Sequence, residues 1–422
     1  MFIHRFSLAS VLCLGPMLVG APPCQAYAQT DSLSVAEAIA QALERGPRVV
    51  AARLGADSRR ERATIASALP DPMLSVGVMN RPFDFGSDQA MTMNQVQLAQ
   101  QLPWAGKRSH ASQREARLTA AAQSDAEEVA ASVVERVRTL YYRMAYIDRA
   151  IEVMEETARL LSDLHQIALT QYEVGNGAQQ DILLAQVAQA RMEADIRVMR
   201  QRRIAAAARF NGLLGRSPAA PVGVLDLPDP DPDLPELEAL MAMAEGRPAL
   251  RAAGARIEAA AAQRDLASRA HLPDFNVVVG YSQRPEFPDL FSVMVGIPLP
   301  VRRGSVQQPL VRESEASEAA AEAVQLDLYS ETYAALAERR ADAVRAGEVS
   351  EVLRTDILPQ ANAAVESGLS SYRVGTLDFM AVLESQMLVN QYEVERLRLA
   401  AEHQAALAGI DALLGIIPGG TQ

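Results

Sequence analysis

Apolar and polar residues alternate along four short segments of the chain. In the first segment, Leu74, Val76 and Val78 fall on one side, and Ser75 and Gly77 fall on the other. A period of two predicts β-strands with one apolar and one polar face. The predicted strands span about residues 72–80, 94–102, 274–283 and 291–299. The proline at position 298 is expected to shorten the fourth strand or to place it at an edge.

Much longer segments without such alternation predict helices. Residues 104–174 contain no proline, and Gly175 follows them. If fully helical, this segment is about 105 Å long at a rise of about 1.5 Å per residue. A second long helix is predicted at about 310–374, with a kink at Pro359. A shorter return helix follows each long one, at about 178–214 and 377–414.

The two halves of the chain repeat one another. YEVGNGAQQDILLAQ, which begins at Tyr172, returns as YRVGTLDFMAVLESQ at Tyr372, and LPDPMLSVG at Leu69 returns as LPDFNVVVG at Leu272. We infer one repeat at 29–226 and another at 237–418, joined by the Pro/Asp-rich linker 227–236 and followed by a tail at 419–422. The expected fold is mainly α with a small β part, an internally duplicated helix–hairpin–long helix–turn–helix unit.

The start of the chain predicts export. Residues 1–28 have the features of a secretory signal peptide, because Arg5 precedes a short apolar run and a small-residue cleavage motif ends at Ala28. Cleavage would remove Cys13 and Cys24, the only two cysteines; the alternative is lipidation of Cys24, which the prolines before it disfavour. The formal net charge is -12, Lys107 is the single lysine, and no region is basic enough to predict nucleic-acid binding.

The predicted strands have the length of membrane-crossing strands, about nine or ten residues each. Lipid cannot satisfy an open sheet edge and four strands are too few for a barrel, so copies would have to combine. Two copies would supply eight strands and three would supply twelve; the alternative is a soluble sheet that caps a coiled coil. In the membrane interpretation, lipid-facing residues include Val76, Val96, Val277 and Val295, and an aromatic girdle includes Phe83, Phe85, Phe275, Phe287 and Phe291.

The duplicated Y-x-V-G…L-x-x-Q element, with the hairpins and long helices around it, resembles the TolC family of outer-membrane efflux proteins. The resemblance covers about residues 31–418. It implies a homotrimer with a twelve-stranded β-barrel in the outer membrane and an α-helical tunnel in the periplasm. It also implies two further partners, a periplasmic adaptor and an inner-membrane transporter, for which the chain is the exit duct. LPWAGKR, Leu102–Arg108, is similar to members that serve heavy-metal resistance–nodulation–division pumps.

The cargo stays open at this stage. The resemblance allows metal ions, drugs or, in type I secretion, polypeptides. The alternative from another class is a periplasmic coiled-coil scaffold that never enters the membrane. Methionines 73, 79, 91 and 93 crowd the first hairpin; thioethers bind Cu(I), but we favour gap filling and lipid contact as their role.

No motif for catalysis or cofactor binding is present. His110, His165, His271 and His403 never fall three or four residues apart, so no pair shares a helix face as metal ligands. The chain has neither a phosphate-binding loop nor a nucleophile elbow. We therefore expect no enzymatic activity and no cofactor.

The turns between the long and the return helices are the candidate functional site. The resemblance implies that an adaptor docks there, on Val174, Gly175, Asn176, Val374, Gly375 and Thr376; the simpler interpretation is that the glycines only end helices. Asp181 and Asp378 follow in the first turns of the return helices, where a carboxylate stabilises the helix dipole by about 0.3–1 kcal/mol. The resemblance places aspartate rings in this region, which would favour cations.

Overall fold

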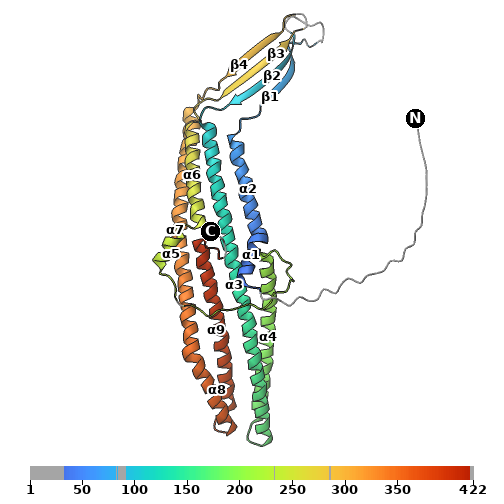
Figure 1. Cartoon of the computed structure of the whole chain (residues 1–422), viewed down its shortest axis with the longest axis vertical. Coiled ribbons are helices and arrows are strands. Elements are labelled where there is room, and N and C mark those ends of the chain that lie inside the picture. Colours follow the sequence, from blue (N-terminus) through green and yellow to red (C-terminus); the bar gives the residue numbers. More distant parts are fainter. Residues whose placement is uncertain (1–32, 82, 84–91, 232, 285–286, 419–422) are drawn as a thin grey trace, which may run out of the picture.

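The computed structural model describes residues 33–81, 83, 92–231, 233–284 and 287–418. The predicted signal peptide with both cysteines, Phe85 and Met91 of the first hairpin, and the tail 419–422 lie outside the described residues. The described part is elongated (Figure 1). A sheet lies at one end, helices run along the long axis, and the two turns that connect the long helices to the return helices lie at the other end.

Both repeats show the same order of elements. The first contains α1 (Val35–Arg45), α2 (Pro47–Ser67), β1 (Met73–Met79), β2 (Met93–Leu102), α3 (Lys107–Glu173) and α4 (Gln179–Leu213). The second contains α5 (Leu237–Ala244), α6 (Pro248–Ser268), β3 (Phe275–Gln283), β4 (Leu290–Gly296), η1 (Arg303–Gln307), α7 (Gln308–Val352), η2 (Leu353–Ile357), α8 (Leu358–Arg373) and α9 (Phe379–Leu414).

Prolines account for two departures of the observed elements from the predicted ranges. The second long helix is interrupted by η2, a π-helical turn that lies just before Pro359. Proline lacks the N–H that the regular i→i−4 bond requires, so the helix widens by one residue instead of stopping. Strand β4 ends at Gly296 rather than near residue 299, because Pro298 cannot donate to the ladder.

The four strands form one antiparallel sheet in the order β1-β2-β3-β4. Each repeat supplies one hairpin, and the central pair, β2 with β3, joins the two repeats. In this register Val76 lies opposite Val96, which in turn lies opposite Tyr281 on the other side. Residues of like polarity therefore line up across the strands, as the alternating pattern predicts.

The helices stack end to end in two columns beside α3 and α7. Helix α4 ends next to the start of α2, where Leu213 lies close to Gly46. In the second repeat, α9 ends next to the start of α6, where Gly415 lies close to Pro248. Two shorter helices thus match the length of one long helix (Figure 1).

The apolar core is distributed along the long axis rather than gathered in one globule. One cluster surrounds Phe210 and Tyr141 where α1, α3 and α4 meet, and another surrounds Leu161 and Phe379 near the tip. Burial of each such large apolar side chain stabilises the fold by about 1.5–3 kcal/mol. Among the described residues, no helix is both long enough and apolar enough to cross a membrane.

Candidate functional site

The two glycine turns have the same backbone structure. Gly175 has φ of +77° and Gly375 has φ of +75°, in the left-handed region that glycine adopts at least cost. The N–H of Asn176 donates to the carbonyl of Gln171 at 2.8 Å, and the N–H of Thr376 makes the equivalent bond at 3.0 Å. Each glycine N–H also donates to the carbonyl three residues earlier, that of Tyr172 or Tyr372, at 3.0 Å. The two bonds together form a Schellman motif, which ends a helix and satisfies its last carbonyls.

The two turns lie next to one another although 200 residues separate them in sequence. The side-chain amide of Gln171 donates a 3.2 Å hydrogen bond to the carbonyl of Arg373, which joins the helical hairpin α3–α4 to the helical hairpin α8–α9. The valines before both glycines are exposed, and an added Cβ at either glycine would meet nothing within 4 Å. Each glycine is therefore required by its backbone angle and not by packing, and the six predicted docking residues form one open surface.

The two predicted carboxylates have different environments. Asp181 is half-buried in the first turn of α4 and accepts a 3.3 Å hydrogen bond from the hydroxyl of Tyr372. Asp378 is exposed at the N-cap of α9, and its side chain makes no capping hydrogen bond. Asp181 thus links the two hairpins, whereas Asp378 faces solvent within this single chain.

Tyr372 is the tip residue whose importance the sequence reasoning missed. Its side chain is 7% exposed and packs edge-on against Phe379, with ring centroids 5.5 Å apart, whereas Tyr172 in the first repeat is 47% exposed. Burial, followed by the negative charges of Asp181 and Asp378, raises the pKa of Tyr372 to about 12. The hydroxyl therefore stays protonated at physiological pH and keeps donating to Asp181. The repeated tyrosine was a visible signal, but its two environments could not be distinguished from the pattern.

The four predicted lipid-facing valines lie on the same face of the sheet. Val76 pairs with Val96, and Val277 pairs with Val295, each at even spacing from the other apolar positions of its strand. The opposite face carries a polar row that runs Ser75, Gln97, Gly280 and Ser292 across all four strands. Phe83 and Phe291 are exposed near the far end of the sheet.

The LPWAGKR segment ties the sheet to the helices and one repeat to the other. The ring of Trp104 stacks on Phe275 with centroids 5.4 Å apart. Lys107 forms a 2.9 Å ion pair with Asp274 and donates to the carbonyl of Leu272 at 2.6 Å. The single lysine of the chain is therefore a structural anchor between repeats.

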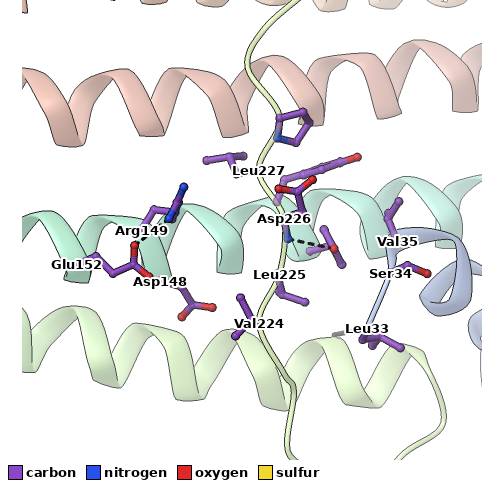
Figure 2. A pocket seen from close by; sticks show the side chains of 13 residues that line it. Leu33, Ser34, Val35, Asp148, Arg149, Glu152, Val224, Leu225, Asp226 and Leu227 are labelled. Atoms are coloured by element: carbon purple, nitrogen blue, oxygen red, sulfur yellow. Dashed lines mark hydrogen bonds and ion pairs between the residues drawn. The ribbon is translucent and has the colours of Figure 1, made fainter. Parts of the chain in front are cut away.

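A cavity of about 490 Å³ lies where the linker crosses α3, near the middle of the molecule. The backbone N–H of Asp226, a linker residue labelled in Figure 2, donates a 3.3 Å hydrogen bond to the hydroxyl of Tyr141. Three of the four charged side chains of the lining, all but that of Asp226, form ion pairs that the structure shows: Asp148 with Arg203 at 2.7 Å, and Arg149 with Glu152 at 3.0 Å. The cavity therefore lies beneath the linker, and the charges of Asp148, Arg149 and Glu152 in its lining are all paired.

Potential metal ligands do not converge. Among the described residues, no three His, Cys, Asp or Glu side chains are grouped as a metal site would require. Met79 and Met93 are cross-strand partners in the first hairpin, and Met73 lies at the other end of β1. The role favoured for these methionines, gap filling and lipid contact, stays a prediction.

Comparison with known proteins identifies the family. The family model described as "Outer membrane efflux protein" matches residues 38–216 and 240–416, which are most of the two repeats. None of the curated protein sequences compared matches the chain significantly.

Three solved structures with the same fold are distant from this chain in sequence. The outer-membrane channel OprN is 18% identical with a TM-score of 0.79, covering 90% of this chain and 89% of its own. CusC is 16% identical with a TM-score of 0.78, covering 92% and 93%, and the open state of the Neisseria gonorrhoeae MtrE channel is 15% identical with a TM-score of 0.76, covering 90% and 89%. These likenesses confirm the predicted fold class, and the family and its neighbours are channel proteins rather than enzymes. Because the family model matches well over half of the chain, this protein belongs to the outer membrane efflux protein family.

Proposed function

We propose that three copies of this chain form the exit duct of a tripartite efflux system, which carries small toxic cargo such as metal ions or drugs from an inner-membrane transporter and a periplasmic adaptor to the exterior. The observation that carries the proposal is the separation of two unlike ends. A sheet with one apolar face lies at one end, and the two exposed turns at Gly175 and Gly375 lie at the other (Figure 1). Helix α3 alone is about 100 Å long at about 1.5 Å per residue, a length that suits a periplasmic tunnel.

The sheet supports insertion into the outer membrane. Its strands have seven to ten residues, close to the length of tilted membrane-crossing strands. The face with Val76, Val96, Val277 and Val295 is proposed to meet lipid, and the row with Ser75 and Gln97 to face water.

The glycine turns support docking of an adaptor. They are exposed, small and adjacent, and the bond from Gln171 to Arg373 holds them side by side. Three copies would place six such turns around one opening. An adaptor hairpin that carries apolar residues would bury Val174 and Val374, which the isolated chain leaves in water.

Cation preference of the pore provides a test of the two carboxylates. We expect that Asp181→Asn with Asp378→Asn lowers the cation-to-anion permeability ratio in planar-bilayer recordings, because a ring of charges sets the local ion concentration. Assembly should be preserved, since an asparagine Oδ1 can still accept from Tyr372 and a helix-dipole contribution is only about 0.3–1 kcal/mol. Unchanged selectivity in an open pore would assign both residues to helix stabilisation alone.

Transport in cells tests the function itself. The full chain is produced in a Gram-negative host that lacks its own outer-membrane efflux channels, together with candidate adaptor–transporter pairs. The expected result is restored resistance to a metal ion or a drug, and a heat-sensitive oligomer in the outer-membrane fraction. A freely soluble periplasmic protein without channel conductance would instead support a scaffold, and export of a polypeptide alone would redirect the cargo assignment to secretion.

A further inference from the structure

The segment between β4 and α7 lies where the sheet meets the helices, and its exposed side chains are of two kinds (Figure 1). Ile297, Leu299 and Val301 are apolar and are 47%, 75% and 84% exposed. Arg302 and Arg303 follow directly and are exposed as well. Apolar side chains next to long basic ones are typical of a membrane surface, where the apolar groups enter the hydrocarbon and the charged ends stay with the headgroups.

The single tryptophan marks the same edge of the sheet. Trp104 follows β2, and its ring stacks on Phe275, the first residue of β3. Tryptophan is enriched where a membrane meets water. Because β2 and β4 both run toward the helices, the residues after β4 lie at the same edge as the residues after β2. If the sheet enters the outer membrane as proposed above, this edge lies at the periplasmic surface of that membrane.

A cavity of about 440 Å³ opens just beyond this edge, between the end of α6 and the start of α7. Arg303 and Arg312 line it, and neither side chain has an ion-pair or hydrogen-bond partner in the described part of the chain. Gln307 and Glu315 line it too. The Oε1 of Gln307 is buried without a hydrogen-bond partner among the described residues, and Glu315 forms no ion pair with them. The cavity therefore combines donors without acceptors and acceptors without donors.

We propose that this cavity binds the phosphoethanolamine headgroup of a membrane phospholipid, with the phosphate on Arg303 and Arg312 and the ammonium on Gln307 and Glu315. The inference rests on the insertion of the sheet proposed above. It adds the class of lipid that is bound at the periplasmic surface and the residues that select it.

The chemistry of the headgroup matches the two kinds of side chain. Guanidinium groups bind phosphate through parallel N–H bonds, and a primary ammonium offers three N–H donors to carboxylate and amide oxygens. Phosphatidylglycerol carries the phosphate but no cation for Glu315, and phosphatidylcholine carries a cation without an N–H donor. The volume of about 440 Å³ lies within the range of about 300–1,000 Å³ that is usual for ligand cavities.

The apolar residues before the cavity favour a lipid over free phosphoethanolamine. Ile297, Leu299 and Val301 continue the period-two positions of Val293 and Val295, which lie on the face proposed to meet lipid. The acyl chains of a lipid held at the cavity would cover these exposed side chains and remove them from water. A soluble phosphoethanolamine molecule has no group that could do so.

Native mass spectrometry of the full-chain oligomer tests the site. The protein is purified in detergent, stripped of phospholipid and titrated with phosphatidylethanolamine, phosphatidylglycerol or phosphatidylcholine of identical acyl chains. We expect the parent to prefer phosphatidylethanolamine over both others. R303Q with R312Q should weaken its binding about tenfold or more, because two charge-assisted contacts to the phosphate are lost. E315Q should reduce the preference over phosphatidylglycerol while the phosphate stays bound.

The chain offers a matched control for the loss of two charges. Arg197 and Arg202 line a cavity of about 460 Å³ on α4, away from the sheet (Figure 1). R197Q with R202Q should leave the binding of phosphatidylethanolamine unchanged. An equal loss in this control would show attraction by overall charge and overturn the site, as would unchanged binding in R303Q with R312Q. Soluble O-phosphoethanolamine that competes as well as the lipid binds would overturn the assignment to a membrane lipid.

The outcomes separate the lipid site from the duct. A parent that conducts in planar bilayers but shows no preference among the three lipids would overturn the site and leave the duct standing. A parent that neither forms an oligomer nor inserts would overturn the duct, and the site with it. Loss of the oligomer in R303Q with R312Q in detergent without phospholipid would place these arginines between copies of the chain, which overturns the proposal.

Discussion

Replacing Asn176 and Thr376 together by tryptophan is expected to abolish efflux in cells while leaving the channel assembled. Both residues directly follow the left-handed glycines, and both are exposed at the tip. The backbone bonds that end the helices come from the main chain, so they persist in the variant. The side-chain bond from Thr376 to the carbonyl of Ser371 is lost, but it is an exposed bond of small net value. Two indole rings per copy would place six bulky groups on the surface where an adaptor is proposed to dock.

The measurement is resistance to a toxic cargo, read beside trimer yield and single-channel conductance. The matched control is Asn176→Ala with Thr376→Ala, which removes the same side chains without adding bulk and should retain efflux. Site-specific crosslinking to the adaptor should disappear in the tryptophan variant and persist in the alanine variant. If the tryptophan variant protects cells as well as the parent does, the turns are helix ends only and the adaptor binds elsewhere.

An arginine at Val96 is expected to prevent stable insertion, whereas an arginine at the adjacent Gln97 is tolerated. Val96 lies in the middle of β2 between Val76 and Tyr281, on the face proposed to meet lipid. Gln97 lies one residue further along the same strand, between Ser75 and Gly280, on the polar face. Arginine at the bilayer midplane costs about 2–4 kcal/mol on the lipid face of such a sheet, and about 0–1 kcal/mol near an interface.

The expected cost of an arginine also depends on how deep in the membrane the residue lies. Val277 is only the third residue of β3 and lies close to the helices, so Val277→Arg should cost less than Val96→Arg. Heat-sensitive trimer in the outer-membrane fraction, quantified for the three variants at equal expression, is the readout. Equal yields from Val96→Arg and Gln97→Arg would contradict the assignment of a lipid face.

Local patterns explain why the main elements were predictable. Period-two alternation in residues 94–102 depends only on which side chains neighbour one another along the strand, and the observed strand β2 spans Met93–Leu102. A helix without proline continues until a residue with a left-handed backbone ends it, and Gly175 does so. Pro298 and Pro359 act through their own missing N–H, so their positions were informative, although the π-helical form of the second interruption was not predicted.

Contacts between residues that are distant in sequence could be identified only from the tertiary structure. The hydroxyl of Tyr372 meets Asp181 at a separation of 191 residues, while the equivalent Tyr172 is half exposed. Lys107 meets Asp274 across the two repeats in the same way. The repeated sequence predicts equal roles for equivalent residues, but in one chain only some of them have the other repeat beside them.

By itself, then, the sequence determined the duplication, the long helices, the two faces of each strand and the two glycine turns, because each depends on backbone preferences and periodicity within a few residues. The tertiary structure alone decided which edges of the described sheet have one neighbour, which of two equivalent tyrosines is buried, and that ion pairs such as Asp125 with Arg256 join α3 of one repeat to α6 of the other. These depend on how two similar halves pack against each other, since packing places one copy of a repeated residue inside the chain and leaves the other at its boundary.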